Sequence, residues 1–251
     1  MKKWRNVIVF DVLMVLLIIL LYSPVQLALN PLDPNFFKAA LSVIAGVFII
    51  YELVKVNGRA IMTARAAKQI SEGSEEVNAD DVKMTLSEYE RTSVVGTYAK
   101  HAIAELESAE ARRAKLYETI AGKFQEGSLT YFKFIEVVDA ATNAIVHNSA
   151  ILARRIQAFD VEDYNRNARA TITGLFNRST IPEEVRKEKR AVYEMSLNDM
   201  RGIVAANERL LVELERFSNE LNQLETNANA ERNDRLLEEV NTLVEETKYY
   251  R

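Results

Sequence analysis

Hydrophobic residues are arranged in two ways along this sequence, as long and mostly apolar runs before residue 56 and as periodic stripes after it. Two apolar runs, at about residues 7–23 and 36–54, are each close to the ~20 residues that an α-helix needs to cross a bilayer. A short segment with three prolines separates them. Residues 1–55 are therefore predicted to form a two-span transmembrane hairpin. The alternative is a signal peptide followed by a buried core helix, but no clear small-x-small cleavage site follows the first run.

Lysine and arginine residues flank this predicted hairpin on both sides and are absent from its loop. Lys2, Lys3 and Arg5 precede the first run, and four basic residues follow the second. Because positively charged flanks stay on the cytoplasmic side, we expect a multi-pass inner-membrane protein with both termini in the cytoplasm. The four residues after the second run either contact anionic lipid head groups or are ordinary flanking charges. They are Lys55, Arg59, Arg65 and Lys68.

Asp11 is an ionisable residue inside the first apolar run. Ionisable groups within a membrane span are rare and often functional, so a transport or proton-transfer role is one interpretation. Asp11 also lies about one helical turn from the expected cytoplasmic edge. There it could reach interfacial water or pair with Arg5, which is the other interpretation.

From residue 82 onward, apolar residues recur at steps of three and four, which is the pattern of helices that pack on helices. Residues 56–81 are expected to continue the second run as a basic helix and to end in a short acidic connector. Residues 82–251 are predicted to form a cytoplasmic helical bundle or coiled coil, so the whole chain is predicted to be all-α. Only 4 prolines and 8 glycines among 251 residues favour long helices. The pattern does not decide whether the helices pack within one chain or between copies.

Local signals divide this body into helices. One helix is predicted to begin near Asp80, and a break at residues 126–128 gives the next an N-cap at Ser128. Asp160 caps a shorter helix. Thr180 and Glu183 form a capping box for a long helix that extends to about residue 224. A last helix carries one apolar face, formed by Leu236, Val240, Leu243 and Thr247.

Apolar stripes mark the faces that are expected to be buried. The first stripe is rich in alanine and comprises Val95, Ala99, Ala102, Leu106, Ala109, Arg113, Leu116 and Ile120. The second comprises Val138, Thr142, Ile145, Ser149, Leu152, Ile156 and Phe159. Small residues in the first stripe would let a partner helix approach closely.

The long helix carries the stripe that we expect to matter most for interaction, and we call it the α-helical seam. Its members are Met200, Ile203, Asn207, Leu210, Leu214, Phe217 and Leu221. A polar residue such as Asn207 in a seam costs stability but penalises wrong registers and oligomeric states. Ligand binding by Asn207 is a second interpretation. A shifted phase, with Val204 and Leu211 facing inward instead, is a third.

Composition narrows the chemistry that is expected. There are no cysteines, which excludes disulfides, thiolate metal sites and a cysteine nucleophile. The net charge of -4 argues against nucleic-acid binding. His101 and His147 belong to no Glu-x-x-His or His-Glu-x-x-His motif, and no glycine-rich phosphate loop is present. We therefore assign no catalytic, cofactor, metal or small-molecule site and expect a protein that is not an enzyme.

The region around the acidic connector resembles the HAMP linker of bacterial transmembrane receptors. It reads AAKQISEG and then, after the connector, YERTSVVGTYAKHA. Gly73, Glu90, Val94 and Tyr98 match the family's glycine after the first helix, the glutamate that opens the second, and two apolar positions. The resemblance implies a parallel dimer that transmits small helix motions.

The C-terminal quarter resembles a second bacterial family. The sequence from about residue 187, with Asn207-Glu208 before a leucine run and Thr247-Lys248-Tyr249-Tyr250 at the end, is similar to proteins of bromo-chloro-indolyl phosphate hydrolysis. These are related to toxic-anion (tellurite) resistance proteins. The resemblance implies a membrane-linked helical protein, and the family's label implies a phosphatase or anion-resistance activity for which the sequence supplies no nucleophile or phosphate site.

Three functions remain as hypotheses. The first is a membrane-anchored scaffold that self-assembles, or recruits a protein partner, at the cytoplasmic face of a bacterial inner membrane. The second is a signalling component in which the HAMP-like segment relays movements of the spans. The third is a stress-resistance factor that acts on phosphate or oxyanions. Membrane lipids are the expected non-protein partner.

Overall fold

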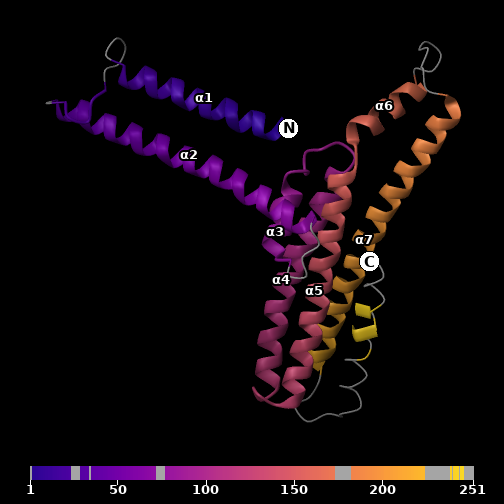
Figure 1. Cartoon of the computed structure of the whole chain (residues 1–251). Helices are drawn as coiled ribbons and strands as arrows, with labels where there is room; N and C mark the ends of the chain where they lie inside the picture. Colours follow the sequence, from indigo (N-terminus) through magenta and orange to yellow (C-terminus); the bar gives the residue numbers. More distant parts are fainter. Residues whose placement is uncertain are drawn as a thin grey trace. The chain divides into compact units, whose positions relative to one another are not determined.

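A computed structural model of the chain describes residues 2–23, 29–33, 35–71, 77–172, 182–223, 238, 240–242 and 244–245. Regular structure in these residues is helical throughout, which confirms the all-α prediction (Figure 1). The main helices are α1 (Lys2–Tyr22), α2 (Phe36–Ser71), α3 (Ala79–Ser87), α4 (Gly96–Lys123), α5 (Leu129–Ala158), α6 (Val161–Ile172) and α7 (Glu183–Gln223).

The chain forms two compact units, Met1–Arg65 and Ala66–Arg251. The first contains α1 and most of α2, which lie side by side and are joined by hydrogen bonds near both ends (Figure 1). The Tyr22 hydroxyl donates to the Ser42 carbonyl oxygen at 2.7 Å. At the other end, Asn57 Nδ2 donates to Asp11 Oδ1 at 3.0 Å. The partner of Asp11 is therefore a residue of α2.

Among the described residues, one helix is long and apolar enough to cross a membrane, and it is α2, over Phe36–Lys68. The apolar part of α1, Val7–Tyr22, is shorter. The two-span hairpin is therefore not confirmed, and a single candidate span is what the structure supports. The helix continues without a break to Ser71, as expected for the basic segment that follows the second apolar run.

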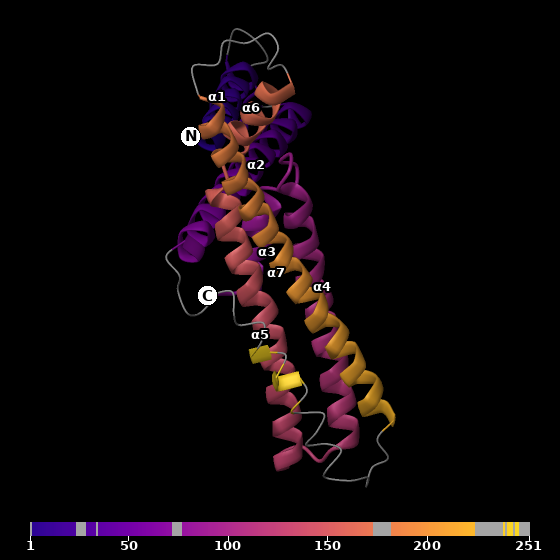
Figure 2. The same ribbon diagram turned by 90° about the vertical axis from the view of Figure 1, so that its right-hand side faces the viewer.

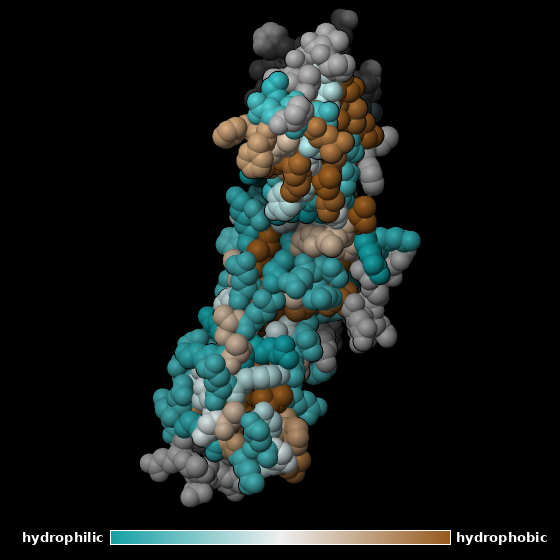
Figure 3. All heavy atoms as spheres, turned by 90° about the vertical axis from the view of Figure 1, so that its left-hand side faces the viewer, coloured by the Kyte–Doolittle hydropathy of each residue, from teal (hydrophilic) through white to brown (hydrophobic). Residues whose placement is uncertain are grey.

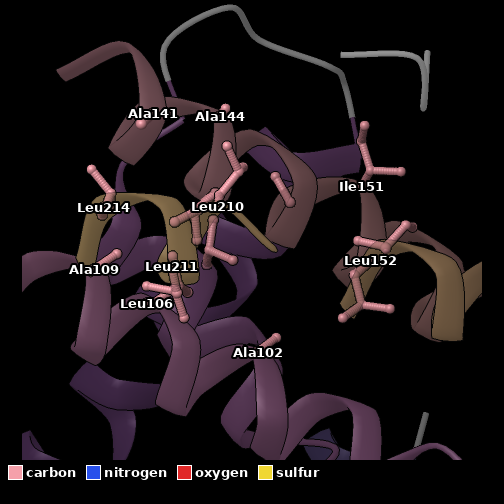
Figure 4. Packing of buried hydrophobic residues seen from close by; sticks show 14 of the residues in the cluster. Ala102, Leu106, Ala109, Ala141, Ala144, Ile151, Leu152, Leu210, Leu211 and Leu214 are labelled. Atoms are coloured by element: carbon pink, nitrogen blue, oxygen red, sulfur yellow. The ribbon is translucent and has the colours of Figure 1, made fainter. Parts of the chain in front are cut away.

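In the second unit, α4, α5 and α7 pack along one another, and α3 lies against α4 and α5 (Figures 1 and 2). The predicted stripes of α4 and α5 are buried between them, except for Arg113. Alanines of α4 face leucines of α7 in the interior (Figure 4). Small side chains on α4 let the larger ones of α7 fill the space between the helices, which is how a close-packed interior is built.

Two of the predicted helix starts are confirmed by their caps. The Ser128 hydroxyl accepts a hydrogen bond from the Tyr131 amide at 3.2 Å, and Gly127 supplies the left-handed turn before it with φ 85°. Asp160 Oδ1 accepts from the Asp163 amide at 2.9 Å at the start of α6. Thr180 lies outside the described residues. The long helix begins at Glu183 and ends at Gln223, close to the predicted limits.

The helix that was predicted to begin near Asp80 does begin there, as α3 at Ala79, but it is short. It ends at Ser87, and a turn leads to the start of α4 at Gly96. Val94 in this turn has φ 74°, a left-handed backbone conformation that breaks a helix. The turn lets α3 lie beside α4, where Lys83 Nζ is 3.0 Å from Glu110 Oε1. A continuous helix would not have brought these two residues together.

The turn passes close to Gly96, the first residue of α4, which leads to a first prediction. A Cβ atom at this position would lie 2.6 Å from the Glu90 carbonyl oxygen and 2.9 Å from that of Tyr89. Both are backbone atoms, so the turn would have to shift. We expect Gly96→Ala to lower the free energy of unfolding by about 1–3 kcal/mol, as overpacking does. Urea denaturation followed by circular dichroism would measure it.

Gly122 provides the matched control for this prediction. It lies in the same helix, and a Cβ atom added there meets nothing within 4 Å. Gly122→Ala should leave stability unchanged or raise it by up to about 1 kcal/mol, because alanine is the better helix former. Equal effects of the two substitutions would contradict the close contact at Gly96.

Candidate functional site

All members of the predicted seam are buried inside one chain. Met200, Ile203, Asn207, Leu210, Leu214, Phe217 and Leu221 are each at most 1% exposed. They face α4 and α5, the two helices against which α7 packs. The phase chosen for the seam is correct, since Val204 is only partly buried, although Leu211 is buried as well. The seam therefore forms the interior of a bundle built by one chain.

Asn207 lies at the centre of a buried polar layer formed by residues of α4, α5 and α7. Its side-chain amide donates to Glu105 Oε2 at 2.9 Å and to Ser149 Oγ at 3.2 Å. Its carbonyl Oδ1 accepts from Asn148 Nδ2 at 3.0 Å. Glu105, Asn148, Ser149 and Asn207 are each at most 2% exposed, and we call them the polar layer. Asn207 thus connects three helices of the same chain.

Glu105 carries the unusual chemistry of this layer. Its Oε2 atom accepts from Asn207, but its Oε1 atom is buried without a hydrogen-bond partner. Burial raises the pKa of the carboxyl group to about 7, and the charge of Glu208 acts in the same direction. The hydrogen bond from Asn207 opposes this rise. Near neutral pH, Glu105 is therefore close to the point at which it gains or loses its proton.

Sequence reasoning identified Asn207 and missed Glu105 and Asn148 as its partners. The positions of Glu105 and Asn148 relative to neighbouring apolar residues did indicate that both are buried. Glu105 follows Ala102 by three positions and precedes Ala109 by four, so it shares their face. Asn148 stands in the same relation to Ile145 and Leu152. What the spacing could not give is that these residues lie at the same level of the bundle as Asn207.

A second cluster holds α6 on the first turns of α7. Asp163 Oδ2 accepts hydrogen bonds from the Tyr193 hydroxyl at 2.7 Å and from Lys189 Nζ at 3.1 Å. These two bonds lower the pKa of Asp163, and partial burial together with Asp163 raises that of Tyr193 to about 12. The Tyr193 ring also lies 5.2 Å from that of Phe159. At neutral pH Asp163 is ionised and Tyr193 is neutral, which is the usual state of each. The cluster therefore serves to hold α6 against α7.

The basic residues expected at the membrane surface all lie on α2. Lys55 Nζ is 3.3 Å from Glu52 Oε1 and 5.4 Å from the centre of the Tyr51 ring, so part of its charge is neutralised. Arg59 and Arg65 are exposed, as is Lys68. At about 100° per residue, the four positions fall within one half of the circumference of the helix.

The two histidines of the chain lie on different helices. His101 on α4 and His147 on α5 are both exposed. Within the described ranges, no group of three or more His, Cys, Asp or Glu side chains is placed to hold a metal ion.

No family model, curated protein or solved structure matches this chain. Both family resemblances therefore stay predictions. For the HAMP-like segment, Glu90 and Val94 lie in the turn before α4 rather than on a helix, and Gly73 is outside the described residues. For the C-terminal resemblance, Asn207 lies within α7, and residues 247–250 are outside the described part of the chain.

Proposed function

We propose that this protein is a membrane-anchored helical scaffold, held by a hairpin of α1 and α2 and presenting a bundle to the cytoplasm of a bacterial cell. The observation that supports it is the contrast between the two units. Large apolar side chains of α1 and α2 are exposed along most of both helices, whereas those of the bundle are mostly buried. Figure 3 shows the hydrophobic side chains gathered on the hairpin and mainly hydrophilic ones over the bundle.

Exposed apolar surface of this kind is unfavourable in water. Burial of apolar area contributes about 25 cal/mol per Å², so a hairpin with so many exposed side chains would associate or insert in a membrane. The exposed residues of α2 include Phe36, Phe37, Ile44, Phe48 and Val54. A helix that is apolar on all sides is typical of a bilayer environment.

The bundle provides the part that would meet a protein partner or a second copy. Because the seam is enclosed within one chain, such contacts would use the outer faces of the bundle. Val192 and Met195 on α7, and Leu129 and Phe132 on α5, are the large apolar side chains most exposed there together with Val212. Such a surface fits either self-assembly or the recruitment of a protein partner.

A signalling role is the second candidate function, and the continuity of α2 favours it. The helix is unbroken from its apolar part to Ser71, and Ile70 near its end belongs to the core of the second unit. A continuous helix that runs from a membrane span into a packed core can transmit small displacements.

The topology of the anchor can be tested with single cysteines, because the chain has none of its own. We expect Leu32→Cys to react with a membrane-impermeant maleimide in intact spheroplasts. Lys2→Cys and Val212→Cys should react only after the membrane is permeabilised. The measurement is the fraction of each variant that is labelled before and after permeabilisation.

Each other outcome of this experiment has a definite meaning. If Lys2→Cys and Leu32→Cys are both labelled in intact spheroplasts and Val212→Cys is not, α2 is the single span and α1 lies outside. Labelling of Val212→Cys in intact spheroplasts would place the bundle outside the cytoplasm. A chain recovered in the soluble fraction would contradict the anchor itself.

A further inference from the structure

The polar layer has an unequal distribution of hydrogen bonds that no packing requirement explains. Asn207 uses both of its amide hydrogens and its carbonyl oxygen. Glu105 Oε1, in contrast, is buried without a partner. An ionised carboxylate is stable in an interior only when its oxygens are hydrogen-bonded or paired with a cation. One oxygen of Glu105 is therefore unsatisfied in either protonation state, and this costs far less free energy when the carboxyl group is neutral than when it is ionised.

The charged groups around the layer do not compensate for an ionised Glu105. From α7, Glu208 contributes a second negative charge. Arg112 of α4 points elsewhere, to the Leu211 carbonyl oxygen at 2.6 Å and to Glu215 at 3.1 Å.

No cation of α3 or α5 is among the groups that shift the pKa of Glu105. Lys83 of α3 is paired with Glu110 and Asp80. From α5, the layer receives the neutral side chains of Asn148 and Ser149.

We propose that the polar layer is a proton-controlled joint, which holds α4 firmly against α5 and α7 when Glu105 is protonated and loosens when Glu105 ionises. An unpaired negative charge in the layer is best relieved by water, and water can enter only if the helices separate locally. The joint would make the strength of the α4–α7 contact depend on the pH of its compartment. The proposal does not depend on which of the functions above is correct.

The direction of the pH dependence follows from the raised pKa of Glu105. The closed bundle binds the proton more tightly than an opened one, where the carboxyl group has its usual pKa of 4.5 rather than about 7. The stabilisation by the proton is therefore fully present below pH 4.5 and is lost as the pH rises through about 7. Above that range the contact stays weaker and no longer changes.

Hydrogen exchange of the full chain in detergent micelles tests the proposal. After correction for the intrinsic exchange rate, the opening equilibrium of amides around Leu106 should rise about 30-fold between pH 5.5 and pH 8.5. In Glu105→Gln, which keeps an oxygen acceptor for Asn207 but has no charge to gain, the rise should be absent. Glu107→Gln, an exposed acid of the same helix, is the matched control and should behave like the wild type.

The proposal is overturned if the wild type shows no such rise, or if Glu105→Gln retains it. Should Glu105→Gln fail to fold, the carboxyl carbon of Glu105 can be titrated by NMR in the wild type. A midpoint near 7 supports the joint, and one below 5 contradicts it.

Discussion

Replacing Asn207 with leucine is expected to lower the free energy of unfolding by about 3–5 kcal/mol, because it removes the residue that satisfies the polar layer. The substitution would leave the Asn148 amide and the Glu105 carboxyl group buried without this partner. Each orphaned neutral group costs about 1–3 kcal/mol, and a charged one costs more. Urea denaturation of the full chain in micelles, at pH 8, would measure the loss.

The sign of this effect separates two roles for Asn207. In a seam between chains, an Asn lowers stability to fix the register, so Asn207→Leu would stabilise the assembly and change its oligomeric state. In a layer within one chain, the same substitution destabilises and leaves the oligomeric state unchanged. Light scattering on the same samples distinguishes these results. A more stable Asn207→Leu variant would contradict the intrachain layer.

Two further variants test the cause of the destabilisation. Asn222→Leu, at an exposed position of α7, should change the stability by less than about 0.5 kcal/mol. Adding Glu105→Leu to Asn207→Leu should restore part of the loss, because replacing both partners of a buried hydrogen bond removes the unsatisfied groups. If the double variant loses more free energy of unfolding than the two single variants lose together, the loss comes from misfit of leucine in the core.

The second large effect is expected for charges placed in the middle of α2. Ile44→Asp with Val47→Asp should move the protein out of the alkali-resistant membrane fraction. An Asp near the centre of a span costs about 2.5–3.5 kcal/mol, so the pair costs about 5–7 kcal/mol. Loss of the membrane-bound fraction, measured by immunoblot after carbonate extraction, is the expected result.

The bundle offers a matched pair of positions for this experiment. Ile44 and Val47 are 66% and 63% exposed, and Val192 and Val212 on α7 are 66% and 61% exposed. Exposure alone therefore predicts the same effect at both places. A bilayer around α2 predicts that Val192→Asp with Val212→Asp leaves the membrane-bound fraction unchanged. Equal loss in the two variants would contradict α2 as the anchor.

The periodic pattern predicted the buried faces of the bundle well, and it did so because burial repeats with the helix itself. The seam of α7 and the stripes of α4 and α5 are interior in the structure, with Arg113 as the exception. Arg113 was placed on the stripe by spacing alone. In the structure its guanidinium group reaches Asp139 on α5 at 2.7 Å. A long side chain can start at the edge of a buried face and end at the surface.

The pattern failed where a single residue changes the direction of the chain. The turn before α4 depends on the backbone of Val94 and on the close approach at Gly96. The left-handed residue is the valine, a residue type that does not indicate a turn. The pairing of Glu105 with Asn207 was also out of reach, because these residues are 102 positions apart. Spacing describes one helix at a time, and the level at which two helices meet is set by their packing.

The long sequence separation between Glu105 and Asn207 also has a consequence for the order in which the helices of the bundle assemble. Helices α4 and α5 are joined by a short connection, so closing their hairpin costs little chain entropy, and it should form early. Asn207 reaches this hairpin only when α7 docks, after a longer intervening segment that includes α6. Until then Glu105 and Asn148 are hydrated, and water must leave both in the final step. We expect docking of α7 to be the slow phase of refolding, and to be faster at acidic pH, where Glu105 gives up less hydration.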